Sequence, residues 1–146
     1  MSAISQREDI VKLVEGWEIA LERRDPAGFS QVYSENVALE SPLGGSVGGR
    51  EAVKKAFESF FKAFPDATFL FEPPRIDGDE VVIVCSIAGT HSGGFAGLPP
   101  SGNPFRFQLV FLLTFRNGQI VRDRRIYDFT GLMVQIGMIK AKPRDR

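Results

Sequence analysis

The feature that most constrains the fold is a long β-hairpin near the C-terminus. Residues 105–116 alternate between large apolar and mixed side chains, Asn117-Gly118 follows, and residues 119–127 alternate again. An Asn-Gly pair between two alternating segments indicates a two-residue type I′ turn, because both turn positions need a positive φ. Such a turn pairs Arg116 with Gln119 and fixes the register of both strands. The chain is therefore expected to build an antiparallel sheet around this hairpin.

This register predicts which side chains share a face. One face is predicted to carry Phe105, Phe107, Leu109, Phe111, Leu113 and Phe115, with Ile120, Arg122, Arg124, Ile126 and Asp128 across from them. The other is predicted to carry Arg106, Gln108, Val110, Leu112, Thr114 and Arg116, with Val121, Asp123, Arg125, Tyr127 and Phe129. The Phe-rich face must be covered by helices or by another subunit. The mixed face suits solvent, a dimer interface or a polar ligand wall, so the sequence leaves open which face lines a pocket.

Three helices are expected before the long strands. Apolar residues repeat at helical spacing from Ile10 to Leu21, and Asp25-Pro26 caps and begins a short second helix. The third helix, over residues 53–64, carries an apolar stripe with four phenylalanines, and Pro65 ends it. The stripe consists of Val53, Ala56, Phe57, Phe60, Phe61 and Phe64. A stripe this regular indicates packing against a core.

The remaining segments indicate strands. Residues 37–40 and 67–72 alternate, and residues 80–89 form a continuous β-branched run. Residues 44–49 contain four glycines and are expected to break the chain, while residues 130–139 suit either a short helix or an extended arm. Helices followed by antiparallel strands predict an α+β domain with the helices on one face of a curved sheet.

Composition excludes several classes of function. The chain has 146 residues, which predicts one domain over residues 1–146 with a flexible basic tail at about 141–146. The formal net charge of zero argues against nucleic-acid binding. One Cys and one His cannot supply a zinc site, so no metal is expected. No cofactor is expected either. Residues 1–9 are polar and no apolar run is long enough to span a bilayer, so we expect a cytoplasmic protein that does not bind membranes.

Asp128 is a candidate for chemistry because the predicted register places it opposite Phe107, at the end of the apolar face. A carboxylate beside apolar walls is a candidate general acid or base. Two structural roles compete with this one: Asp128 could pair with Arg124, or it could cap the turn at Gly131.

Three stretches of sequence resemble a known superfamily. Tyr33-Ser34-Glu35-Asn36, leading to Gly49-Arg50-Glu51, is similar to the nuclear transport factor 2-like superfamily. Gly89-Thr90-His91-Ser92-Gly93, followed by a Gly-Leu-Pro-Pro-Ser-Gly run at 97–102, resembles the signature of its SnoaL-like polyketide cyclases and ester cyclases. Tyr127-Asp128-Phe129-Thr130-Gly131-Leu132 also matches that group. The resemblance spans about residues 8–140.

The resemblance implies a cone: a strongly curved, mainly antiparallel mixed sheet wrapped around three N-terminal helices, with an apolar pocket inside and commonly a homodimer. It implies a small hydrophobic, carbonyl-containing ligand and cofactor-independent acid/base chemistry, such as aldol-type cyclisation or isomerisation. Asp128 would act as the proton shuttle and His91 would assist, with residues 93–104 as a lid over the pocket; a surface or structural role for His91 stays open. The expected ligand pocket comprises Trp17, Tyr33, Glu40, Phe57, Phe61, Phe107, Phe111, Arg124 and Tyr127. For Trp17, Tyr33 and Glu40 an alternative stays open: two core aromatics with hydrogen-bonded tips and one exposed acid.

The sequence departs from two enzymes of this superfamily. By alignment, the positions of the ketosteroid isomerase Tyr, base and acidic donor hold Trp17, Ser41 and Phe111, so classical isomerase activity is not expected. The epoxide hydrolase relay needs two facing carboxylates, whereas Asp123 and Arg125 offer only one. The alternative function is therefore a non-catalytic ligand-binding or dimeric interaction module of the same fold.

Overall fold

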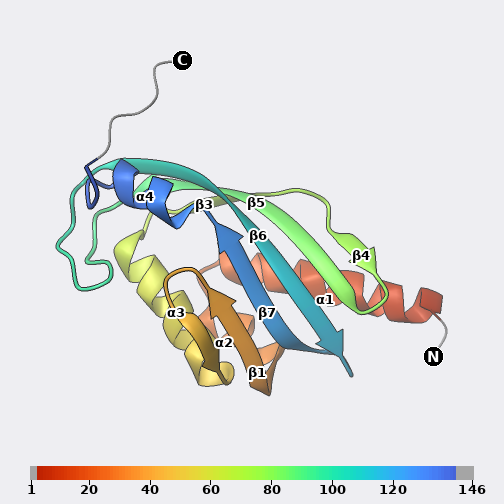
Figure 1. Ribbon diagram of the computed structural model, residues 1–146. Coiled ribbons are helices and arrows are strands. Elements are labelled where there is room, and N and C mark those ends of the chain that lie inside the picture. Colours follow the sequence, from red (N-terminus) through yellow and green to blue (C-terminus); the bar gives the residue numbers. More distant parts are fainter. Residues whose placement is uncertain (1–2, 141–146) are drawn as a thin grey trace.

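The computed structural model describes residues 3–140, and Figure 1 shows its helices lying on one side of a long curved sheet. The helices are α1 (Ala3–Glu22), α2 (Pro26–Gln31), α3 (Arg50–Ala63) and α4 (Phe129–Gln135). The strands are β1 (Tyr33–Ser41), β2 (Gly45–Gly48), β3 (Thr68–Phe71), β4 (Arg75–Asp77), β5 (Glu80–Thr90), β6 (Pro104–Arg116) and β7 (Gln119–Tyr127). This arrangement confirms the predicted α+β class. The predicted tail at 141–146 lies outside the described residues.

The sheet is mixed. Its strand order is β2-β1-β7-β6-β5-β3, and β4 pairs with β5 beside β3. Only β1 and β7 run parallel within this described sheet, and the other neighbours are antiparallel. The core lies between the helices and the sheet face that they cover; its largest fully buried side chains include Trp17, Phe29, Tyr33 and Phe64. Across residues 3–140, no helix has both the length and the apolar character that a membrane span requires.

Three segments differ from the prediction or resolve it. Residues 45–48, expected as a break, form β2 and pair with β1, because backbone hydrogen bonds need no side chain. Residues 75–77 form β4, a three-residue strand directly after Pro73-Pro74 that is too short to show a pattern. Residues 129–135 form a helix rather than an extended arm, with Asp128 as its N-cap.

A β-bulge in β7 makes the predicted hairpin register wrong beyond the turn. Arg116 pairs with Gln119 as expected, but Thr114 pairs with Arg122 while Phe115 pairs with Ile120, which leaves Val121 as an extra residue. Because side chains alternate along a strand, one extra residue exchanges the two faces of everything after it. The residues on the covered face of β7 are therefore Asp123, Arg125 and Tyr127, and those on the uncovered face are Arg122, Arg124 and Ile126.

Candidate functional site

A cavity of about 300 Å³ lies between the helices and the covered face of the sheet. Its walls are mainly aromatic and aliphatic side chains from α1, α2, α3, β3, β5, β6 and α4. The polar side chains in the lining belong to Ser41, Ser59, Arg125 and Tyr127. A concave, mostly apolar space with a few polar groups is the usual form of a small-molecule site.

Arg125 is the only cation among the described residues that line the cavity, and Asp123 lies directly behind it. The Nε and Nη2 groups of Arg125 donate to Asp123 at 3.3 Å and 3.0 Å. The Asp123 side chain is 0% exposed and that of Arg125 is 16% exposed. Among the described residues, Nη1 of Arg125 has no hydrogen-bond partner, so the cation keeps a donor available to a ligand. The guanidinium also lies 5.3 Å from the centre of the Phe111 ring, within cation–π range.

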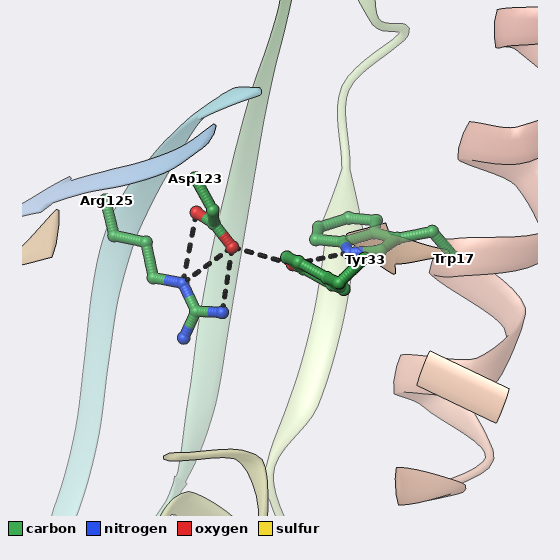
Figure 2. Close-up of polar contacts among 4 residues, drawn as sticks. All are labelled: Trp17, Tyr33, Asp123 and Arg125. Carbon is green, nitrogen blue, oxygen red and sulfur yellow. Dashed lines mark hydrogen bonds and ion pairs between the residues drawn. The ribbon is translucent and has the colours of Figure 1, made fainter. Parts of the chain in front are cut away.

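Two aromatic residues hold this ion pair from behind. The Tyr33 hydroxyl donates to Asp123 at 2.6 Å, and the Trp17 indole N–H donates to the Tyr33 hydroxyl at 3.0 Å. Figure 2 shows the four side chains as one continuous chain of contacts from α1 through β1 to β7. Neither Trp17 nor Tyr33 lines the cavity, and both are almost fully buried. They therefore support the site rather than form its surface.

The electrostatics of this chain keep Arg125 charged and Tyr33 neutral. Burial is the largest single effect and opposes the charged form of Arg125, but the charge of Asp123, its hydrogen bonds and Tyr33 together outweigh burial and raise the pKa of the guanidinium above its ordinary value. Burial, followed by the negative charge of Asp123, raises the pKa of Tyr33 well above its ordinary value. Burial also raises the pKa of Tyr127, and the charge of Arg125 partly opposes this. At neutral pH the cavity thus offers two hydrogen-bond donors, the guanidinium of Arg125 and the neutral phenol of Tyr127.

The structure brings together about half of the residues predicted for the pocket. Those that line the cavity are Phe57, Phe61, Phe107, Phe111 and Tyr127. Tyr127 does so for a reason the prediction lacked, because only the bulged register turns it towards the covered face.

Glu40 and Arg124, predicted as pocket residues, lie on the uncovered face instead. Glu40 pairs with Arg122 at 3.1 Å and with Arg124 at 3.9 Å, and the side chains of both arginines are about half exposed. The placement of Arg124 inside the pocket followed from the uninterrupted register, and the bulge corrects it.

Asp128 caps a helix. Its side chain accepts a hydrogen bond from the backbone N–H of Gly131 at 2.8 Å, so the capping role that the sequence left open is the one observed. Asp128 is exposed and does not line the cavity. The predicted position of Asp128 opposite Phe107 was wrong. In the observed register Tyr127 pairs with Leu109, and β7 ends at Tyr127, before Asp128. A role in proton transfer stays a prediction.

His91 is fully buried but does not line the cavity. Its Nδ1 accepts a hydrogen bond from the backbone N–H of Ser101 at 3.1 Å and lies 2.9 Å from the Ser101 hydroxyl oxygen. Its ring packs against Phe64 and Phe95, which do line the cavity. His91 thus lies one layer behind the cavity wall, and its assistance in catalysis also stays a prediction.

The sequence did not predict that Arg125 lines the cavity or that Asp123 holds it there. It placed both on the mixed face, because a bulge leaves no mark in the pattern of residue types. One signal was available: opposite charges two positions apart on a strand share a face whichever face that is. Over residues 3–140, no cluster of three or more His, Cys, Asp or Glu side chains could hold a metal ion.

Comparisons with known proteins agree with this fold. The family model described as SnoaL-like polyketide cyclase matches residues 11–136. AclR from Streptomyces galilaeus, provisionally assigned as a hydroxylase, is similar to the chain at 26% identity and a TM-score of 0.80, over 95% of this chain and 87% of AclR. IdmH from Streptomyces antibioticus, provisionally assigned as a polyketide cyclase, is similar at 25% identity and a TM-score of 0.73, over 87% and 97%.

A third structure, a SnoaL-like protein from Jannaschia sp. CCS1 provisionally assigned as a polyketide cyclase, shows the same fold at 24% identity and a TM-score of 0.77, over 89% of this chain and 94% of that one. No significant match was found among proteins of curated function. Because the family model covers most of the residues, from the first helix to the last, the chain belongs to the SnoaL-like polyketide cyclase family.

Proposed function

We propose that the protein binds a small hydrophobic ligand in the cavity, with a carbonyl oxygen of the ligand accepting a hydrogen bond from Arg125. The observation that carries this proposal is a paired guanidinium at the wall of an otherwise mostly apolar cavity. Apolar walls favour a ligand with a large hydrocarbon part. The free donor of Arg125 favours one oxygen acceptor at a fixed place, with Tyr127 as a second donor beside it.

The charge balance of the site favours a neutral carbonyl over a carboxylate. Asp123 neutralises Arg125, so a ligand carboxylate would gain a hydrogen bond here but no net charge pairing. A carbonyl oxygen instead gains from a donor that is already oriented and needs no reorganisation. The hydrogen bond from Arg125 would also strengthen if the carbonyl oxygen became more negative during a reaction.

Catalysis is the second part of the proposal. Hydrogen bonding from Arg125 would stabilise the enolate formed when a proton leaves the carbon next to the carbonyl, the step that begins aldol-type cyclisation or isomerisation. The family membership supports this class of chemistry. The alternative, ligand binding without turnover, is favoured by one observation: among the described residues, no carboxylate and no imidazole lines the cavity.

The decisive binding experiment compares a ketone with the alkene of the same length. The wild-type protein should bind the ketone more tightly. The double variant Asp123→Asn/Arg125→Gln removes both charges together, which avoids leaving one buried charge unpaired. It should bind the ketone about 10–100-fold more weakly, the effect of losing one hydrogen bond from a charged donor, and should bind the alkene unchanged. Arg124→Gln, an exposed arginine on the other face, is the matched control. Equal ketone affinity in the double variant and the control would refute the role of Arg125.

Catalysis is tested by deuterium exchange at the carbon next to the carbonyl of the bound ketone. Exchange that the wild-type protein accelerates, and that Asp123→Asn/Arg125→Gln abolishes, would support enolisation. Asp128→Asn and His91→Asn test the two predicted proton-transfer residues in the same assay, and unchanged exchange would exclude that residue. Binding without accelerated exchange would favour the passive alternative.

We also propose a homodimer formed through the uncovered face of the sheet. Val82, Val84, Val110 and Leu112 are only half buried there, and Ile126 is 45% exposed. The four described helices lie on the opposite side (Figure 1). Contiguous apolar surface of this kind is typical of a protein–protein interface. A monomer mass by light scattering at micromolar concentration would contradict the dimer.

A further inference from the structure

One loop contributes a single side chain to the cavity. Residues 92–103, here called the Phe95 loop, join β5 to β6, and Phe95 is their only member in the cavity lining. We propose that Phe95 is a specificity-determining residue that sets how long a ligand the cavity accepts, and that His91 positions it. This inference rests on the proposed function, in which the ligand's oxygen is held at Arg125.

The Phe95 loop is fixed at its base by His91. The backbone N–H of His91 donates to Asn103 at 2.9 Å, and its carbonyl accepts from Gly102 at 2.8 Å. The His91 side chain adds the hydrogen bond from the Ser101 N–H to Nδ1. Its ring centre lies 6.4 Å from that of Phe95, with the rings edge to face. His91 therefore holds both the far end of the loop and one side of the Phe95 ring.

A second attachment docks the loop on α3. The backbone N–H of Gly93 donates to the Ala63 carbonyl at 3.0 Å, at the end of that helix. A Cβ at Gly93 would lie 1.8 Å from the Lys62 carbonyl oxygen, so only glycine permits this approach. Phe95 and Leu98 then exchange backbone hydrogen bonds at 3.0 Å and 2.8 Å around a tight turn. With these attachments the loop presents Phe95 at a defined place.

Phe95 and Arg125 lie near different points along β6, and we infer that they face different parts of the cavity. Phe95 packs on Phe64, with ring centres 5.2 Å apart, and Phe64 packs on Phe105 at the start of β6, at 4.5 Å. Arg125 pairs with Phe111, six residues further along β6. Six residues of extended strand span at most about 20 Å, and the curvature of the sheet shortens this. A ligand anchored by its oxygen at Arg125 thus extends towards Phe95, and the Phe95 ring limits the length of its tail.

The experiment measures the affinities of 2-alkanones of increasing length, with the 1-alkenes of the same lengths as oxygen-free counterparts. The fluorescence of Trp17, the only tryptophan, reports binding, because its ring lies 4.8 Å from that of Phe111 in the cavity wall. In the wild-type protein each added methylene should tighten binding about fourfold until the tail reaches Phe95, after which the affinity falls.

Two substitutions should move this optimum in opposite directions. Phe95→Ala removes about 5 Å of side chain and should favour ketones about three to four carbons longer. Phe95→Trp should favour shorter ones and provides a second test if the alanine variant does not fold; because it adds a second tryptophan, its affinities are measured by titration calorimetry. Leu98→Ala, in the same loop but 40% exposed and outside the lining, is the matched control and should keep the wild-type optimum. An optimum that neither Phe95 substitution moves would overturn the inference.

His91 is tested in the same series. His91→Leu removes the acceptor for Ser101 and should flatten the length optimum while the preference for ketone over alkene persists. His91→Asn offers an oxygen near the position of Nδ1 and should restore the optimum. If His91→Leu keeps an optimum of ketone length as sharp as that of the wild-type protein, His91 does not position Phe95.

The two proposals fail in different ways. If ketones and alkenes bind equally, but Phe95 substitutions still move the optimum, the role of Arg125 is refuted and the role of Phe95 stands. If ketones are preferred and Phe95 substitutions do not move the optimum, the role of Phe95 is refuted and the role of Arg125 stands. If the wild-type protein binds neither series, both proposals are refuted.

Discussion

Replacing Tyr33 with Phe should cost far more stability than the loss of one oxygen atom suggests. The Tyr33 hydroxyl makes two buried contacts at once, since it donates to Asp123 at 2.6 Å and accepts from Trp17 at 3.0 Å. A hydrogen bond to a charged group contributes about 1.5–3 kcal/mol, and a buried N–H left without an acceptor costs about 1–3 kcal/mol. Asp123 keeps its bonds to Arg125 in the variant. We therefore expect Tyr33→Phe to lower the free energy of unfolding by roughly 3–4 kcal/mol.

The assay is urea unfolding followed by circular dichroism, with Tyr127→Phe as the matched control. Tyr127 carries the same hydroxyl at the cavity wall, where it makes no hydrogen bond with the described residues. Its substitution should therefore change the free energy of unfolding by about 0.5 kcal/mol or less. The thermal midpoint of Tyr33→Phe should fall by roughly 10 °C for a chain of this length. If the two variants differ by less than about 1 kcal/mol, the bonds of Tyr33 do not stabilise the fold as argued.

Three further predictions concern other parts of the fold. Gly93→Ala should destabilise the protein by about 2 kcal/mol or more because its Cβ meets the Lys62 carbonyl, whereas Gly16→Ala, with open space in α1, should stabilise it by about 0.5–1 kcal/mol; thermal unfolding of the pair checks both. Burial, followed by the charge of Glu18, raises the pKa of the Cys85 thiol from 9.0 to about 12. Between these values the unfolded chain loses a proton from Cys85 that the folded chain keeps, so Cys85 should lower the free energy of unfolding by about 1.4 kcal/mol per pH unit, and in urea titrations at several pH values the slope of Cys85→Ala should be shallower than that of the wild type by this amount. Asp128→Ala should cost about 1 kcal/mol through the lost helix cap while Asp128→Asn costs little, and equal losses in urea unfolding would argue against the cap.

The sequence was sufficient for the elements whose pattern is local. The apolar stripe of residues 53–64 predicted α3, and Asp25-Pro26 predicted the start of α2, where the Asp25 side chain accepts from the Gly28 N–H. Asn117-Gly118 predicted the hairpin turn, where both residues have a positive φ. In each case the residues that carry the signal also make the local contacts, so no tertiary information was needed.

The site was harder to predict because it depends on one extra residue. Nothing about Val121 as a residue type distinguishes a bulged position from a regular one, and the next residues alternate either way. Without the bulge, Arg124 would face the core and Asp123 would face away. The partners that stabilise the bulged register, Tyr33 above all, come from a strand 90 positions away from Asp123. A pattern read along one hairpin cannot contain that contact.

The bulge also decides which chemistry the cavity supports. In the uninterrupted register a single carboxylate, Asp128, would end the apolar face, free to take a proton from a ligand. In the structure the carboxylate on that side is Asp123, and it arrives with a cation two residues away. Asp123 does not line the cavity, and its carboxylate accepts hydrogen bonds from both Arg125 and Tyr33, so in the proposed function its role is to hold Arg125 in place. The proposed function therefore uses this wall of the cavity to bind and polarise an oxygen, and it requires a proton acceptor other than Asp123.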